Sequence, residues 1–187
     1  MGMTLANKIT VCRILAVPFF IAAILDYSPQ EDYHRFIALG IFLFAVISDL
    51  VDGYVARKWK QQTKAGAILD PLADKILLIF AFVFLYFIND RLPLVKFPAW
   101  LVVWAIGRDV ILIFGVTIVS IFQGVFEIKP TKWGKATTFA EVMSVLAVLL
   151  QWQFLSIFWY IALILIIGST IDYMRKGIKM LNHGEGL

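Results

Sequence analysis

Charged residues and cysteine are both scarce in this chain of 187 residues. Only 16% of the residues are charged and 61% are apolar, which excludes an intrinsically disordered chain and disfavours a soluble globule. Cys12 is the single cysteine, so an internal disulfide and a cysteine-based zinc site are excluded. A free cysteine in an apolar stretch is most simply a packing residue. The composition therefore favours a membrane protein.

Long polar segments are also missing, and apolar runs fill most of the sequence. A helix needs about 20 mostly apolar residues to cross a bilayer, and open strands cannot satisfy their backbone in lipid. The six transmembrane helices expected from these runs are Ile9–Leu25, Phe36–Ala56, Ile68–Ile88, Pro98–Phe122, Lys135–Leu150 and Phe154–Met174. The connections are too short for a second domain. This predicts one all-α, polytopic membrane domain over residues 1–187.

Basic residues follow the connections in alternation. Those of one side are Lys8, Arg13, Arg57, Lys58, Lys60, Lys64, Lys129, Lys132, Lys135, Arg175, Lys176 and Lys179. The opposite side holds Arg35, Arg91 and Lys96 beside Asp26, Glu31, Asp32 and Asp90. The positive-inside rule therefore places both termini in the cytoplasm. The net charge of +4 is mostly explained by topology, and the same basic residues would attract anionic lipid headgroups, so no nucleic-acid partner is expected.

A further set of charged residues lies inside or at the ends of the apolar runs. Its members are Asp49, Asp52, Asp70, Asp74, Lys75, Arg108, Asp109 and Glu141. Ionisable residues are costly at membrane depth, so they are functional candidates by default. A structural network of ion pairs is the alternative, and it explains Arg108 with Asp109 equally well.

The four aspartates form two pairs that flank one basic connection. Spacings of three and four place each pair on one helix face. Four ionised carboxylates at one depth would repel each other unless their pKa values were raised or cations were bound. Two divalent cations would balance the charge, and all-oxygen ligation favours Mg²⁺ or Mn²⁺, with Ca²⁺ as a further candidate.

Small residues and an arginine accompany the aspartates. Gly53, Ala56 and Gly66 leave the neighbouring helix surface without bulky side chains, which suits a ligand or close helix packing. Arg57 could hold a phosphate with its planar fork. A pyrophosphate ligand suits this combination of carboxylates, a nearby arginine and a helix surface without bulky side chains. The expected site is a cavity that opens to the cytoplasm.

These residues resemble the signature of the CDP-alcohol phosphatidyltransferase family at all eight of its positions. The matching run is Asp49-x2-Asp52-Gly53-x2-Ala56-Arg57-x8-Gly66-x3-Asp70-x3-Asp74. Upstream, Asn7-x-Ile9-Thr10-x2-Arg13-x4-Pro18 looks like the amphipathic opening of the family's first helix. Six helices also correspond to the family's core.

The resemblance implies transfer of a phosphatidyl group from a CDP-linked lipid, CDP-diacylglycerol, to an alcohol, with release of CMP. It assigns two metals to Asp49, Asp52, Asp70 and Asp74, and makes Asp74 the candidate base. It assigns donor binding to Asp52, Gly53, Ala56, Arg57 and Gly66. It also implies a homodimer. The protein is then expected in the bacterial inner membrane, with its active site facing the cytoplasm.

The acceptor is expected to be anionic, because Arg108, Lys132 and Lys135 supply positive charge near the cytoplasmic side. Family members that use glycerol 3-phosphate carry a second arginine two turns after the first, where this chain has Val116. The Arg-Asp-Val run and the Lys-Pro…Gly-Lys-x2-Thr connection look more like cardiolipin synthases, which favours phosphatidylglycerol. Glycerol 3-phosphate is the alternative.

An ion or proton transporter is the competing class, with the aspartates as a proton relay. A relay would spread carboxylates through the membrane thickness, whereas these four gather at one depth. The sequence therefore favours the transferase.

Overall fold

The structure of the chain is a computed structural model that describes the backbone of residues 5–59, 64–123 and 132–183. Side chains are described over residues 11–48, 75–112, 114 and 132–175.

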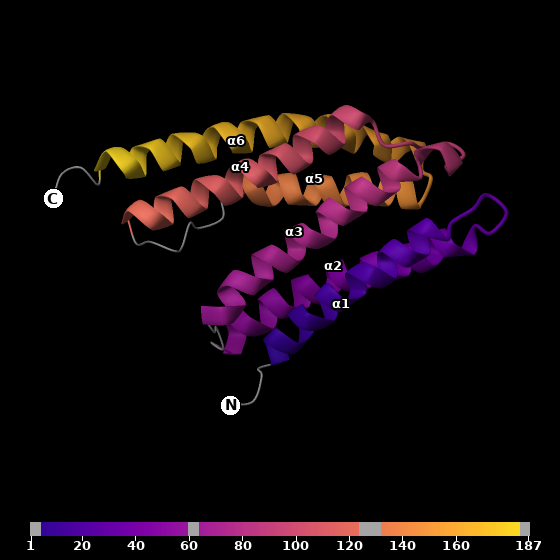
Figure 1. Cartoon of the computed structure of the whole chain (residues 1–187), viewed down its shortest axis with the longest axis horizontal. Helices are drawn as coiled ribbons and strands as arrows, with labels where there is room; N and C mark the ends of the chain where they lie inside the picture. Colours follow the sequence, from indigo (N-terminus) through magenta and orange to yellow (C-terminus); the bar gives the residue numbers. More distant parts are fainter. Residues whose placement is uncertain (1–4, 60–63, 124–131, 184–187) are drawn as a thin grey trace. The chain divides into compact units, whose positions relative to one another are not determined.

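The described backbone is helical, with six α-helices and two short 3-10 helices (Figure 1). The α-helices are α1 (Leu5–Leu25), α2 (Tyr33–Trp59), α3 (Lys64–Phe87), α4 (Ala99–Gln123), α5 (Lys132–Leu149) and α6 (Ile157–His183). The 3-10 helices are η1 (Asn89–Arg91) and η2 (Gln153–Ser156). The described ranges contain no β-strand element, so the predicted all-α class is confirmed.

Several helices are longer than the apolar runs that predicted them. At its C-terminal end α2 continues to Trp59, and α6 continues to His183, through polar and basic residues. Helical hydrogen bonds join backbone groups, so they continue where the side chains become polar. Apolarity marks the part of a helix suited to lipid, and the ends of the helix lie beyond it.

The chain divides into two compact units, each described by itself. Unit 1 contains residues 1–97 and 148–152, and unit 2 contains residues 98–147 and 153–187. In unit 1, α1 packs against both α2 and α3. Spacings of three and four place Val17, Phe20 and Ile24 on one buried face of α1, and the Phe20 and Phe42 rings lie 6.1 Å apart. These buried side chains form part of the apolar core of unit 1.

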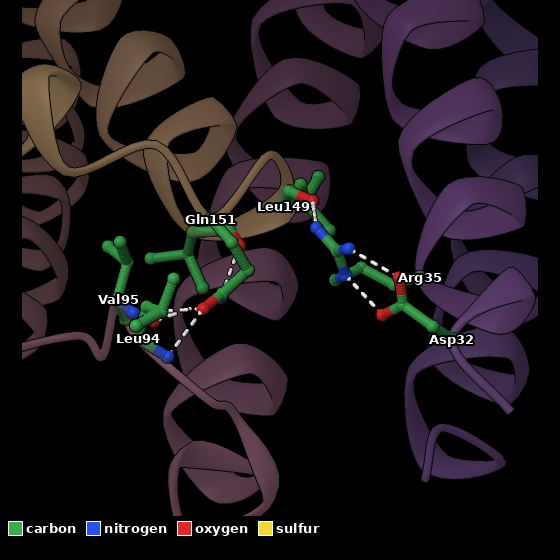
Figure 2. Close-up of polar contacts among 7 residues, drawn as sticks. Asp32, Arg35, Leu94, Val95, Leu149 and Gln151 are labelled. Carbon is green, nitrogen blue, oxygen red and sulfur yellow. Dashed lines mark hydrogen bonds and ion pairs between the residues drawn. The ribbon is translucent and has the colours of Figure 1, made fainter. Parts of the chain in front are cut away.

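Gln151 joins two connections within unit 1 (Figure 2). Its side-chain Oε1 accepts hydrogen bonds from the backbone N–H groups of Leu94 and Val95, both at 2.9 Å. Its Nε2 donates to the carbonyls of Val95 and Val148 at 3.1 and 2.8 Å. The Gln151 backbone has a φ of 53°, a left-handed conformation that is uncommon for a residue with a side chain. One side chain thus holds the α3–α4 connection beside the end of α5.

Arg35 makes a second link in unit 1 (Figure 2). Its Nε and Nη2 donate to the two carboxylate oxygens of Asp32 at 2.7 and 2.6 Å, and its Nη1 donates to the Leu149 carbonyl at 2.6 Å. The sequence suggested only a topology role for Arg35, whereas the structure uses all three of its nitrogens to join the α1–α2 connection to the end of α5.

Unit 2 is built from α4, α5 and α6. Helix α4 packs against α6. The Thr137 hydroxyl donates to the Leu165 carbonyl at 3.1 Å and joins α5 to α6. A Cβ added at Gly168 would lie 3.8 Å from the Trp133 ring, an ordinary van der Waals distance, so the ring of this α5 residue lies beside α6.

One described helical segment, Gln153–Arg175, is long and apolar enough to cross a membrane. Among the described residues, the shorter apolar helical stretches are Val11–Leu25, Tyr33–Ser48 and Lys75–Phe87. The six-span topology stays a prediction.

Candidate active site

Two consecutive helices carry the predicted donor and metal residues. Asp49, Asp52, Gly53, Ala56 and Arg57 lie in the last turns of α2. Gly66, Asp70 and Asp74 lie in the first turns of α3. Their backbone is helical, as the spacing predicted, but their side chains lie outside the described residues. Each aspartate pair therefore shares one helix face, and the metal and donor roles stay predictions.

The short connection keeps the two sets of residues near each other. Helix α2 ends at Trp59 and α3 begins at Lys64. Because consecutive Cα atoms are 3.80 Å apart, five steps allow at most about 19 Å between these two ends. Helix α1 packs against both helices in the same unit. The aspartate pairs thus belong to neighbouring helix ends (Figure 1).

Arg108, predicted to bind the acceptor, lies in α4 and is 3% exposed. Its Nη1 donates to Asp109 Oδ1 at 2.7 Å, and the Asp109 side chain is also buried. The ion pair considered from the sequence is therefore present. Arg108 Nε is buried and has no hydrogen-bond partner among the residues whose side chains are described. The guanidinium thus keeps a donor for another group.

Lys132 and Lys135, the other predicted acceptor residues, lie in the first turn of α5, and both are exposed. A spacing of three places them on one side of the helix. The N-terminal end of a helix also carries partial positive charge, so this turn attracts anions.

Buried charges also lie outside the predicted site, and two of them are in α5 and α1. Glu141 in α5, already conspicuous in the sequence, is 1% exposed. Arg13 in α1, which the sequence suggested was a topology residue, is also 1% exposed. It precedes buried Val17 by one turn, and this helical spacing is the signal that could have placed it on the packed face.

The sequence profile described as CDP-alcohol phosphatidyltransferase matches residues 3–169 and spans both units. The chain belongs to this family. The CDP-alcohol phosphatidyltransferase resemblance of the sequence is therefore confirmed. The family match covers the whole aspartate signature as well as Arg108, Lys132 and Lys135.

Two bacterial relatives are each named CDP-diacylglycerol–glycerol-3-phosphate 3-phosphatidyltransferase. The Aquifex aeolicus protein is 34% identical, over 96% of this chain and 98% of its own length. The Haemophilus influenzae protein is 34% identical, over 89% of each chain. A human relative named cardiolipin synthase (CMP-forming) is 32% identical, over 94% of this chain and 62% of its own length. Both acceptor classes suggested by the sequence thus occur among the names of similar proteins.

Proposed function

We propose that this family member transfers the phosphatidyl group of CDP-diacylglycerol to the hydroxyl of an anionic glycerol-type alcohol. The observation that carries the proposal is the complete aspartate signature on α2 and α3, within a family match over residues 3–169. The relatives' names supply the CDP-diacylglycerol donor and the CMP product.

The donor set suits two hard divalent cations, Mg²⁺ or Mn²⁺. Asp49, Asp52, Asp70 and Asp74 offer only carboxylate oxygens, the ligands that such ions prefer, and their four negative charges balance two dications. Bound there, the ions would supply positive charge that stabilises the diphosphate of the donor.

The chain's own residues have separate tasks in the transfer. Asp74 accepts the proton of the acceptor hydroxyl. The acceptor oxygen bonds to the phosphorus that carries the diacylglycerol, the bond from this phosphorus to the bridging oxygen breaks, and CMP leaves with that oxygen. Arg57 binds the donor phosphates with its planar fork. The cytidine and ribose fit beside the small residues Gly53, Ala56 and Gly66. Asp52 also contributes to binding of the donor.

Phosphatidylglycerol is the acceptor we propose. Arg108 is a buried guanidinium that is paired with Asp109 and keeps an Nε donor that no described residue uses, which suits an oxygen of a phosphodiester. Glycerol 3-phosphate carries close to two negative charges, and Val116 occupies the position where a second arginine would help. The names of the two bacterial relatives favour glycerol 3-phosphate as the second candidate.

The mass of the lipid product decides between the acceptors. The purified protein is incubated with CDP-diacylglycerol and Mg²⁺ or Mn²⁺, and each acceptor is offered separately. We expect CMP and a lipid with two phosphatidyl groups from phosphatidylglycerol. Formation of phosphatidylglycerophosphate as the only lipid product would contradict phosphatidylglycerol as the acceptor. Absence of CMP with either acceptor, together with ion uptake into proteoliposomes, would favour the transporter.

The proposed enzyme crosses the bacterial inner membrane six times, with both termini and the active site on the cytoplasmic side, and forms a homodimer. The alternation of basic connections supports this topology. The apolar segment Gln153–Arg175 and the bacterial relatives support the location.

A further inference from the structure

Arg35 and Arg108, two of the three arginines that are buried among the described residues, use their guanidinium groups differently. Arg35 donates through Nε, Nη1 and Nη2 to Asp32 and Leu149. Arg108 donates through Nη1 to Asp109, and its buried Nε has no hydrogen-bond partner within the described part of the chain. A buried donor without a partner is costly, typically about 1–3 kcal/mol. Arg108 therefore has the capacity for a ligand that Arg35 lacks.

The contact between Arg108 and Asp109 fixes which edge of the guanidinium remains available. A guanidinium can grip an anion with the edge formed by Nε and Nη2. Asp109 Oδ1 holds the opposite nitrogen, Nη1, at 2.7 Å. The carboxylate thus leaves the Nε edge open.

The sequence separation of the two residues favours an orienting role. Side chains at i and i+4 face each other on a helix and stabilise it, whereas adjacent side chains do not. Arg108 and Asp109 are adjacent in α4, so the guanidinium must lean sideways to make the contact. Both side chains are at most 5% exposed, so water competes little for the hydrogen bond.

We propose that Asp109 is a positioning residue, which holds Arg108 by Nη1 so that its Nε edge faces the phosphate of the acceptor. The inference rests on the proposed acceptor role of Arg108. Asp109 itself does not touch the acceptor. Its proposed effect on acceptor binding passes through Arg108, the residue to which its Oδ1 is hydrogen-bonded.

Steady-state kinetics of CMP release test the inference, with the acceptor and the donor varied in turn. Asp109→Leu removes the hydrogen bond at similar volume, and Asp109→Asn keeps an oxygen acceptor but removes the charge. We expect Asp109→Leu to raise the acceptor KM about tenfold, the range of one charged hydrogen bond, with the donor KM within twofold. The acceptor KM of Asp109→Asn should lie within threefold of the acceptor KM of the unaltered protein. Asp109→Ala replaces the leucine variant if that variant does not fold.

A double variant separates positioning from a general structural effect. If Asp109 acts only through Arg108, Asp109→Leu adds no further rise in acceptor KM to Arg108→Ala. Additive effects, or equal impairment by Asp109→Asn and Asp109→Leu, would overturn the inference. A normal acceptor KM in Asp109→Leu, with a raised acceptor KM in Arg108→Ala, would also overturn the inference. This result would leave the proposed acceptor role of Arg108 intact. A normal acceptor KM in Arg108→Ala would refute both that role and the inference.

Discussion

At the scale of single residues, the aspartate signature is the feature on which the chemistry depends. Asp49 and Asp52 lie in the last turns of α2, and Asp70 and Asp74 lie in the first turns of α3. Each pair lies on one helix face because spacings of three and four return to the same side. A neutral side chain at one of these positions removes one charge and one strong metal ligand at nearly constant volume.

Asp70→Asn should abolish CMP release and leave the helical content unchanged. The amide is nearly the size of the carboxylate, so the fold is kept, but it carries no charge for a divalent cation. The measurement is CMP release beside circular dichroism, and EDTA should abolish the activity of the unaltered protein. Full turnover in EDTA would contradict the proposed metals. Asp172→Asn, an α6 aspartate outside the signature, serves as the control for loss of a carboxylate.

At the scale of helices and connections, polar side chains hold the loops of unit 1 together. Gln151 spans the α3–α4 connection and the end of α5, and Arg35 joins the α1–α2 connection to Leu149 (Figure 2). Arg91 adds a third link, since its Nη1 donates to the carbonyls of Leu25 and Tyr27 at 3.0 and 3.2 Å. These contacts are polar and directional, so they fix the arrangement of the helix ends, which apolar packing alone specifies less strictly.

Gln151→Ala should lower the free energy of unfolding by about 2–3 kcal/mol. Four hydrogen bonds end on this side chain, each contributes about 1 kcal/mol net, and partial exposure reduces their sum. Unfolding in detergent, followed by circular dichroism, measures the loss. Gln153→Ala removes the same side chain from an exposed position and should change little. Equal effects of the two variants would contradict the role given to Gln151.

The contribution of Asp32 to stability should depend on pH. The hydrogen bonds from Arg35, and its positive charge, hold the pKa of the Asp32 carboxyl below its ordinary value of 3.8. A lowered pKa in the folded state means that the stabilisation is complete above about pH 4 and is lost as the pH falls through the folded pKa. The carboxyl is partly exposed, so solvent weakens the effect.

The measurement compares the melting temperatures of the unaltered protein and Asp32→Asn from pH 7 to pH 3. Their difference should stay constant down to about pH 5 and shrink below pH 4. Asp26→Asn removes an exposed carboxylate outside the Arg35 contact and provides the comparison. A difference that grew on acidification would have the wrong sign for this ion pair.

At the scale of the whole molecule, the charge distribution predicts the orientation in the membrane. Basic residues gather on the predicted cytoplasmic connections and acidic residues on the opposite ones. This asymmetry predicts cytoplasmic termini. The proposed lipid donor and an anionic acceptor would then meet the site from the same side.

Cysteine labelling in intact cells checks this orientation. In a Cys12→Ala background, Gly186→Cys should resist a membrane-impermeant maleimide until the cells are opened, because the C-terminus is predicted to be cytoplasmic. Lys96→Cys, an exposed position on the α3–α4 connection, should react at once. Labelling of Gly186→Cys in intact cells would contradict the predicted cytoplasmic C-terminus.

The sequence by itself determined the all-α class and the helical setting of the signature, because apolar run lengths and spacings of three and four are local properties of the chain. It also determined the family, since the aspartates lie close together in sequence. Tertiary structure decided the burial of Arg13, the links made by Arg35 and Gln151, and the burial of Arg108 Nε without a hydrogen-bond partner among the described residues. Burial depends on which helices pack together, and the distant partners, Leu149 for Arg35 and Val95 for Gln151, lie 114 and 56 residues away. Contacts over such separations leave no periodic signal in the sequence, so folding alone reveals them.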